Sequence, residues 1–429
     1  MTSSPDPETP PKRPRKPVRI AEIRGVAKLI TRSSLGITRM AEGVHRHVWN
    51  AIGIPGGTKT GRTRGLTGLI YSGVHGSLMA AGLGVDAVLA GLQPLLENEE
   101  IPAAPHTPQR EAILSALNGF MGDQLAAHNN PLATPMILRH AGNILNWQTP
   151  PAPTHLSGKV LLLVHGLCMN DLQWDARHNG QSVNHGKALA AALNYTPIYA
   201  RYNSGLHVSQ NGRALSAQLE QVARHWPTPI DELTVVAHSM GGLVIRSALH
   251  VATQAGLRWP AYLKKIVFLG TPHHGSPLER AGAWVDERMG SMAYTAPFVP
   301  LGQVRSAGIT DLRFGNLLDA DWQGSDRFAR LPDTRQIVPL PRDVACFTVA
   351  ATTADKRGIL ADRLIGDGLV PLHSALGHHD DPRRSLAFGE DAQLIAYRTN
   401  HLALLSSPDV TRQMVDWLTP QDGDRENEC

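Results

Sequence analysis

Residues 233–242 decide the fold of this chain, and they read LTVVAHSMGG. The first six residues form a short apolar run that predicts a buried β-strand, and the glycines at the end open a helical pattern. A serine at such a strand-to-helix turn is typical of a nucleophile elbow, which holds the serine hydroxyl clear of the sheet. Side chains two places before and after the serine would collide in that turn, so Ala237 and Gly241 meet the steric demand around Ser239.

Apolar runs and helical patterns alternate along residues 155–420. Strand–helix alternation with nearly continuous apolar strands predicts a mostly parallel sheet covered by helices on both faces, which is an α/β fold. Strands are expected at Lys159–His165, Pro197–Arg201, Leu233–His238, Lys265–Leu269, Val344–Ala350 and Gln393–Tyr397. Helices are expected at Gln181–Leu193, Gln210–His225, Gly241–Ala255 and Pro408–Leu418.

The composition is that of a globular protein with a sizeable core. The chain has 429 residues, of which 42% are hydrophobic and 18% are charged. These values exclude a wholly disordered chain and a coiled coil. The three cysteines, Cys168, Cys346 and Cys429, form no CxxC pair, which disfavours both a disulfide scaffold and a cysteine zinc site. We therefore expect a reducing, cytoplasmic compartment.

Positive charge is concentrated near the N-terminus. Residues 1–64 hold 13 Lys and Arg against 4 Asp and Glu, although the whole chain has a formal net charge of only +4. Such an arm is either a solvated tail or a peripheral contact with an anionic membrane. The arm has no interleaved aromatic residues and no zinc-finger spacing, so no nucleic acid is expected as a partner.

The first third of the chain differs from the rest in composition and in its hydrophobic pattern. Six prolines within residues 1–17 predict a disordered basic leader. Residues 18–150 are predicted to form a helical N-terminal region, which includes a helix over 109–127. The uncharged stretch 66–85 fits either a helix packed through Gly and Ala or a membrane span.

A proline-rich boundary at 149–154 separates that region from the predicted α/β domain, which covers residues 155–420. Residues 277–340 lack a strong strand pattern and contain scattered aromatic and Met side chains, so we expect a cap inserted into the domain there. Residues 421–429 are expected to form a flexible tail.

Two backbone amides are candidates for holding a developing negative charge on an oxygen. One is that of Met240, which begins the helix after the serine. The other belongs to the loop after the first strand, which reads VHGLCMND over 164–171; Leu167 is the choice there and Cys168 the alternative. His165 in the same loop is interpreted as a structural histidine without a role in proton transfer.

The remaining partners of the serine are expected in the order acid, then histidine. Asp367 lies in a glycine-flanked turn and His401 follows the last predicted strand. Both therefore come at carboxyl ends of strands, where open α/β sheets place their sites. His401 would take the proton of Ser239, and Asp367 would orient the imidazole. The alternatives are Asp355 for the acid and His373, His378 and His379 for the base.

Residues 159–420 resemble the α/β-hydrolase superfamily in its bacterial lipase and esterase branch, akin to triacylglycerol lipases and to the inositol deacylase that trims lipid anchors. The supporting motifs, in chain order, are VHGLCMND (164–171), AHSMGG (237–242), LGTPHHGSP (269–277), GDGLVPLHSALG (366–377) and NHLALLSSPDV (400–410). The resemblance implies an α/β-hydrolase fold with the nucleophile at Ser239, the acid at Asp367 and the base at His401. An alanine replaces the usual first glycine of the elbow, and little of residues 1–150 is covered.

These observations together predict a serine hydrolase that cleaves a hydrophobic or lipid acyl ester through an acyl-enzyme on Ser239. Two alternatives stay open: an acyltransferase that uses the same triad, and a membrane- or partner-binding protein that keeps the triad as a relic. No cofactor is expected. No metal is expected either, because the paired histidines His273 and His274 have no ligand partners at useful spacing.

Overall fold

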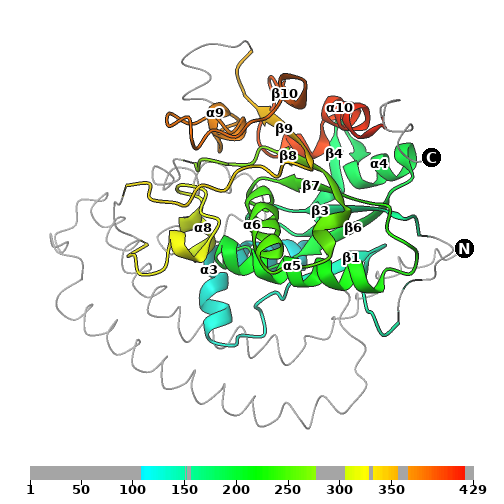
Figure 1. Ribbon diagram of the computed structural model, residues 1–429, viewed down its shortest axis with the longest axis horizontal. Helices are drawn as coiled ribbons and strands as arrows, with labels where there is room; N and C mark the ends of the chain where they lie inside the picture. The colour runs from blue at the N-terminus through cyan, green and yellow to red at the C-terminus, as the bar shows by residue number, and fades with distance from the viewer. Residues whose placement is uncertain are drawn as a thin grey trace, which may run out of the picture. The chain divides into compact units, whose positions relative to one another are not determined.

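The computed structural model describes residues 108–149, 151, 156–276, 305–327, 332–355 and 366–420 (Figure 1). The chain divides into two compact units. One comprises Pro108–Asn129 and Ala133–Cys429; of the other, Met1–Thr107 with Asn130–Leu132, only the last three residues are described. The predictions for the leader, for helices before residue 108, for the stretch 66–85 and for the tail at 421–429 lie outside the described residues.

The larger unit is built on an eight-stranded sheet with the order β10-β9-β8-β7-β3-β6-β1-β2. The strands from β10 to β6 pair in parallel, whereas β1 pairs antiparallel with β6 and with β2. The α/β class and the mostly parallel sheet predicted from the sequence are confirmed. The strands are β1 (Ile137–His140), β2 (Asn143–Ile144), β3 (Lys159–Val164), β6 (Thr196–Arg201), β7 (Glu232–His238), β8 (Leu263–Leu269), β9 (Ala345–Ala351) and β10 (Gln393–Ala396).

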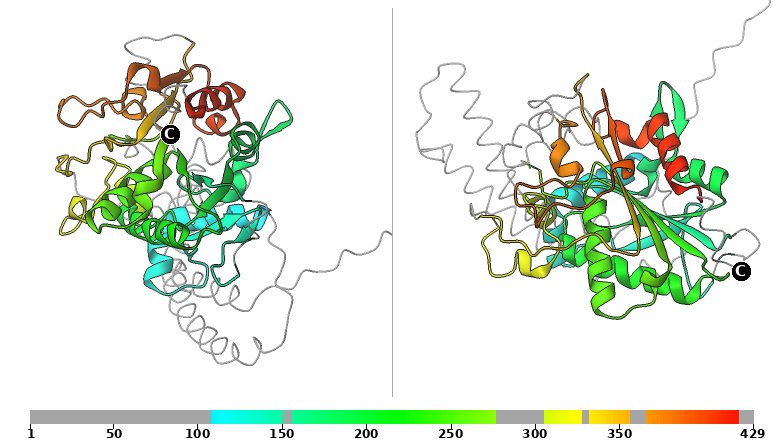
Figure 2. Two further views of the ribbon diagram at one scale, coloured as in Figure 1. Left: turned by 45° about the vertical axis from the view of Figure 1, so that its right-hand side comes forward. Right: turned by 45° about the horizontal axis from the view of Figure 1, so that its top comes forward.

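Strand β3 shows why helices cover both faces of the sheet, because its side chains are buried on both sides. Leu162 and Val164 belong to one core cluster with α5 and α6, whereas Leu161 and Leu163 belong to a second cluster with α4 and α10. Figure 2 shows the two helix layers on opposite sides of the sheet. The helices are α4 (His185–Leu193), α5 (Val208–His225), α6 (Met240–Gln254) and α10 (Pro408–Leu418).

The start of α4 corrects a prediction. The sequence pattern predicts a helix over Gln181–Leu193, but Gln181–Val183 form β5, which pairs with β4 (Ala176–His178). An Asn-Gly turn at 179–180, with both residues at positive φ, closes this hairpin. Asn184 then caps α4 by accepting the Lys187 N–H. The helix prediction was wrong at its start because the hairpin and the cap delay the first helical turn.

The sheet also contains residues that precede the proline-rich boundary. Strands β1 and β2 lie at residues 137–144, within the region 18–150 that was expected to be helical. The helix expected over 109–127 is present as α3 (Pro108–Ala127), and it contacts α8 (Ala307–Asp311), which lies in the segment expected to form the cap. Among the described residues, none of the helices combines the length and the apolar character needed to cross a bilayer.

Candidate active site

Ser239 occupies a strained turn between β7 and α6. Its backbone has φ 55° and ψ −126°, a conformation that a residue with a side chain rarely adopts. Two hydrogen bonds hold the turn: the Ser239 N–H donates to the Leu269 carbonyl (2.8 Å), and the Ser239 carbonyl accepts from Gly242 N–H (3.0 Å). The surrounding sheet therefore holds the Ser239 backbone in this strained conformation.

Close backbone packing explains the small residues around the serine. A Cβ placed on Gly241 would lie 2.5 Å from the Val164 carbonyl oxygen, and one on Gly166 would lie 2.9 Å from Ser239 Cβ. Both separations are shorter than real Cβ contacts, so a larger residue at either position would push β3 and its loop away from the elbow. The glycines thus allow the end of β3 to approach the serine closely.

Asp367 and His401 form a buried pair. His401 Nδ1 donates to Asp367 Oδ2 at 2.6 Å, and the two residues are 4% and 1% exposed. Asp367 Oδ1 accepts the N–H groups of Leu369 (2.9 Å) and Val370 (2.8 Å). The carboxylate is therefore fixed by two local amides, and the proton on Nδ1 leaves Nε2 of the neutral imidazole as an acceptor.

The imidazole of His401 lies beside the residues that flank Ser239. Its ring centroid is 4.7 Å from that of His238, and His238 Nε2 donates to the His401 carbonyl at 3.2 Å. A Cβ on Gly270, which follows the acceptor of the Ser239 amide, would lie 3.1 Å from His401 Nδ1. The serine hydroxyl makes no hydrogen bond to His401 within the described residues, and catalytic hydrogen bonds of this kind often tighten only in the substrate complex.

His238 was not among the residues predicted for the site, although it immediately precedes the serine. Burial lowers its pKa well below the usual value for histidine, and the neighbouring His401 lowers it further. The His238 ring therefore packs against His401 in its neutral form and adds no charge beside it. Its position in the elbow was the only sequence signal that pointed to this role.

The two oxyanion alternatives differ in their hydrogen bonds. The Cys168 amide donates to Ser204 Oγ at 3.0 Å, so it is already engaged, which favours Leu167. Met240 is the first residue of α6, where amide groups have no partner within the helix. His165 of the same loop is fully buried, and burial lowers its pKa to about 4. A neutral His165 matches its interpretation as a structural residue.

The rival acid and one rival base are engaged elsewhere. Asp355 is exposed and forms an ion pair with Arg398 at 2.6 Å. His379 Nδ1 accepts the Asp381 N–H at 2.9 Å. The structure therefore brings Asp367 to His401 and leaves Asp355 on the surface. No group of three or more potential metal ligands occurs in the part of the chain that the structure describes.

The candidate oxyanion loop, residues 165–171, rests on α3, a contact that was not predicted from the sequence. A Cβ on Gly119 of α3 would lie 2.2 Å from Cys168 Sγ, so the helix backbone touches the loop directly. Asn170 Nδ2 donates to Ser115 Oγ (2.7 Å) and to the Glu111 carbonyl (3.1 Å). No sequence signal could have linked residues so far apart along the chain.

Known proteins resemble this chain in part. The family described as a domain of unknown function (DUF7379) matches residues 135–307, which is less than half of the chain. No curated protein matches. The mature lipase BlEst2 of Bacillus licheniformis is 19% identical with a TM-score of 0.39, over 66% of this chain and 98% of that one.

Two further solved structures are similar at the same level. The Staphylococcus hyicus lipase is 13% identical with a TM-score of 0.37, over 63% of this chain and 98% of that one. A Bacillus megaterium epoxide hydrolase is 11% identical with a TM-score of 0.32, over 62% and 95%. At these values the likeness assigns no reaction to this chain.

Proposed function

We propose that the protein is a serine hydrolase that cleaves a carboxylic ester with a hydrophobic or lipid-like acyl group. The observation that carries the proposal is the strained Ser239 at the end of β7, with the buried Asp367–His401 pair beside it. A nucleophile, a base and a group that orients the base are the three parts that covalent acyl transfer requires. The resemblance of the surrounding motifs to lipases and esterases supports an ester as the substrate.

The reaction begins with proton transfer. His401 Nε2 takes the proton of the Ser239 hydroxyl as the serine oxygen attacks the ester carbonyl. The tetrahedral intermediate collapses when His401 returns the proton to the departing alcohol, which leaves an acyl group on Ser239. Water then attacks this acyl-enzyme while His401 takes the water proton. The second tetrahedral intermediate collapses when His401 returns that proton to Ser239 Oγ, which breaks the acyl bond, releases the carboxylic acid and restores the serine hydroxyl. Asp367 stabilises the imidazolium in both steps through its bond to Nδ1.

Two backbone amides complete the proposed site. The N–H groups of Met240 and Leu167 would hold the negative oxygen of each tetrahedral intermediate. Each such donor contributes roughly 3 kcal/mol of transition-state stabilisation. Because Gly166 packs against Ser239, the loop that carries Leu167 is held near the attacking oxygen.

The direct test is the variant Ser239→Ala in the full chain. It should lose ester turnover and labelling by a fluorophosphonate probe while it stays folded by circular dichroism. Ser182→Ala, at an exposed position in β5, is the control and should keep both. Persistent hydrolysis by Ser239→Ala would rule out the mechanism. Product analysis with a competing alcohol separates hydrolysis from acyl transfer to an acceptor other than water.

We also propose that residues 1–64 bind anionic membranes, because this arm carries 13 Lys and Arg against 4 Asp and Glu. The full chain should pellet with vesicles that contain phosphatidylglycerol at low salt, and less at high salt. Replacing Lys12, Arg13, Arg15 and Lys16 by Gln should reduce pelleting. Equal pelleting of both proteins at both salt concentrations would reject the proposal.

A further inference from the structure

A charged pocket lies between α6 and the described part of the cap. Its walls include Arg246 of α6, His273 and His274 from the loop after β8, and Arg335 and Arg384. The proposed ester chemistry uses none of these five side chains.

Arg246 is a buried cation without an acidic partner. The residue is 7% exposed, its Nη1 lies 3.3 Å from His273 Nδ1, and its Nη2 donates to the Val338 carbonyl. Its Nε has no hydrogen-bond partner, and no described carboxylate forms an ion pair with it. Burial lowers its pKa to about 10, so the guanidinium is still charged at neutral pH.

The other charges of the pocket are largely balanced. Arg335 pairs with Asp333 at 2.8 Å, and Arg384 lies 3.6 Å from the same carboxylate. Asp321, which also lines the pocket, accepts three backbone N–H groups, at distances of 2.8–2.9 Å. Three guanidinium groups thus lie near two carboxylates, and Arg246 forms an ion pair with neither of them.

The two histidines add hydrogen-bonding capacity without charge. Since Arg246 can only donate, His273 Nδ1 accepts from it, and the proton lies on Nε2, which has no partner. His274 Nε2 donates to the Gly377 carbonyl at 2.9 Å, which leaves Nδ1 as an acceptor without a partner. Burial lowers the pKa of His274 to about 3, so its ring is neutral. The pocket walls therefore combine an unbalanced cation with unsatisfied polar atoms.

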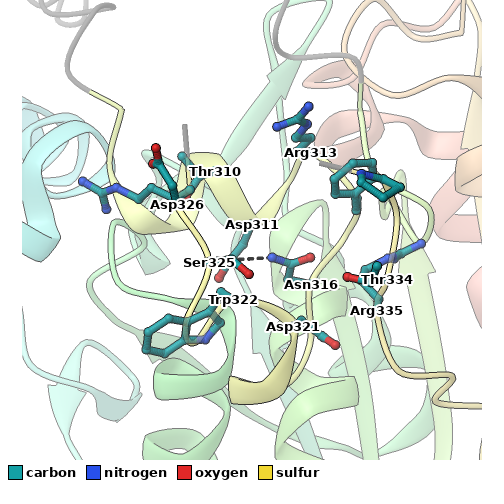
Figure 3. A pocket seen from close by; sticks show the side chains of 13 residues that line it. Thr310, Asp311, Arg313, Asn316, Asp321, Trp322, Ser325, Asp326, Thr334 and Arg335 are labelled. Carbon is teal, nitrogen blue, oxygen red and sulfur yellow. Dashed lines mark hydrogen bonds between the residues drawn. The ribbon is translucent and has the colours of Figure 1, made fainter. Parts of the chain in front are cut away.

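The adjoining pocket provides a contrast. It shares Asp321 and Arg335 with the first, and Figure 3 shows its lining. Its buried carboxylate, Asp311, accepts from the Val208 amide at 2.8 Å and from Asn316 Nδ2 at 3.1 Å, the bond drawn as a dashed line. Neighbouring groups thus satisfy the buried carboxylate of Asp311, whereas Nε of the buried Arg246 has no hydrogen-bond partner.

We propose that the pocket around Arg246 binds an oxyanion of the phosphate class, with Arg384 as the second contact. The planar fork of an arginine matches the oxygens of such an anion. The anion is either a phosphate group carried by the ester substrate or free phosphate. Arg246 lies seven residues after Ser239, about 10 Å along the axis of α6. The case in which the ester substrate carries the phosphate rests on the proposed function.

Binding is tested by isothermal titration calorimetry of the full chain with inorganic phosphate. Arg246→Lys and Arg384→Gln should each weaken binding by about tenfold or more, because a charge-assisted hydrogen bond is lost. Arg383→Gln is the matched control: its side chain is 80% exposed and pairs with Asp381 outside the pocket, so affinity should be unchanged. Thermal unfolding verifies that each variant is folded. Arg384→Gln keeps the test decisive if Arg246→Lys does not fold.

A kinetic comparison identifies the source of the phosphate. Dihexanoyl phosphatidic acid and dihexanoylglycerol differ only in the phosphate. If the substrate carries the anion, Arg384→Gln should lower kcat/KM for the phosphate ester about tenfold relative to the neutral ester. An unchanged ratio, together with weakened calorimetric binding, identifies free phosphate instead.

Failure of the pocket and failure of the proposed function give different results. A folded wild-type chain that does not bind phosphate, or variants that bind it as tightly as the wild type, would overturn the pocket proposal. Phosphate binding that depends on Arg246 and Arg384, in a protein without ester turnover, would uphold the pocket and contradict the hydrolase.

Discussion

The two halves of the proposed site are held in different ways. On the triad side, the Ser239 amide donates a hydrogen bond to Leu269 of the neighbouring strand. Asp367 accepts hydrogen bonds from backbone amides only two and three residues further along the chain. On the oxyanion side, the loop at Cys168 rests on Gly119, which belongs to a helix far upstream. The triad depends on strand ends and short turns, whereas the oxyanion loop depends on a distant element.

This difference separates two kinds of substitution. A change on the triad side removes a chemical group, and its effect should appear in the chemical step alone. A change in α3 touches no reacting atom, yet it should displace the Leu167 amide, which is proposed to hold the transition state. We expect the two halves to fail independently.

The largest effect is expected on the triad side. Asp367→Asn should lower kcat by about four orders of magnitude, because an amide no longer fixes the tautomer in which Nε2 accepts a proton. Ester hydrolysis under saturating substrate measures this. A loss smaller than tenfold would mean that Asp367 is not the orienting acid.

A smaller effect is expected on the oxyanion side. Gly119→Ala places a Cβ 2.2 Å from Cys168 Sγ and should push the loop aside. We expect kcat to fall on the order of tenfold to a hundredfold with little change in KM. Gly389→Ala, where a Cβ meets nothing closer than 3.9 Å, is the control. Equal kcat for both variants would show that α3 does not position the loop.

The sequence revealed the triad side more fully than the oxyanion side for a physical reason. Nearly continuous apolar runs such as KVLLLV of β3 report burial on both faces, and the elbow combines strand, turn and helix signals within ten residues. The pairing of Asp367 with His401 was expected from motif order. Strand β1 was missed because ILRH is short and half polar, and the seat of Cys168 on Gly119 is a contact between distant segments.

Acidification should lower the free energy of unfolding, because a buried histidine lies near each half of the proposed site. Burial lowers the pKa of His165, in the oxyanion loop, and of His185, which contacts the Leu404 carbonyl near His401, to about 4 each. The unfolded chain therefore binds more protons below about pH 6.5. The free energy of unfolding should fall by about 2 kcal/mol per histidine between pH 7 and pH 5.

Urea unfolding at the two pH values measures this loss. His185→Gln should reduce the loss by about 2 kcal/mol, because a glutamine does not titrate. The relevant quantity is the difference between pH 7 and pH 5 in each protein, since the substitution also changes stability at neutral pH. An identical difference in the variant would show that His185 is protonated in the folded chain.

The smallest effect is expected for the rival acid. Asp355 and Arg398 are largely exposed, so Asp355→Asn should change stability by no more than about 0.5 kcal/mol. Its kcat should equal that of the wild type, in contrast to Asp367→Asn. A large loss of activity in Asp355→Asn would reverse the assignment of the acid.

The buried thiol of Cys168 gives the protein an internal reporter. Burial raises its pKa to about 12, and its contact with Gly119 shields the sulfur, so alkylating reagents should not modify it in the closed fold. Modification then requires α3 to lift transiently from the loop. The alkylation rate of Cys168 would therefore count local opening events, and it would show whether catalytic turnover waits for them.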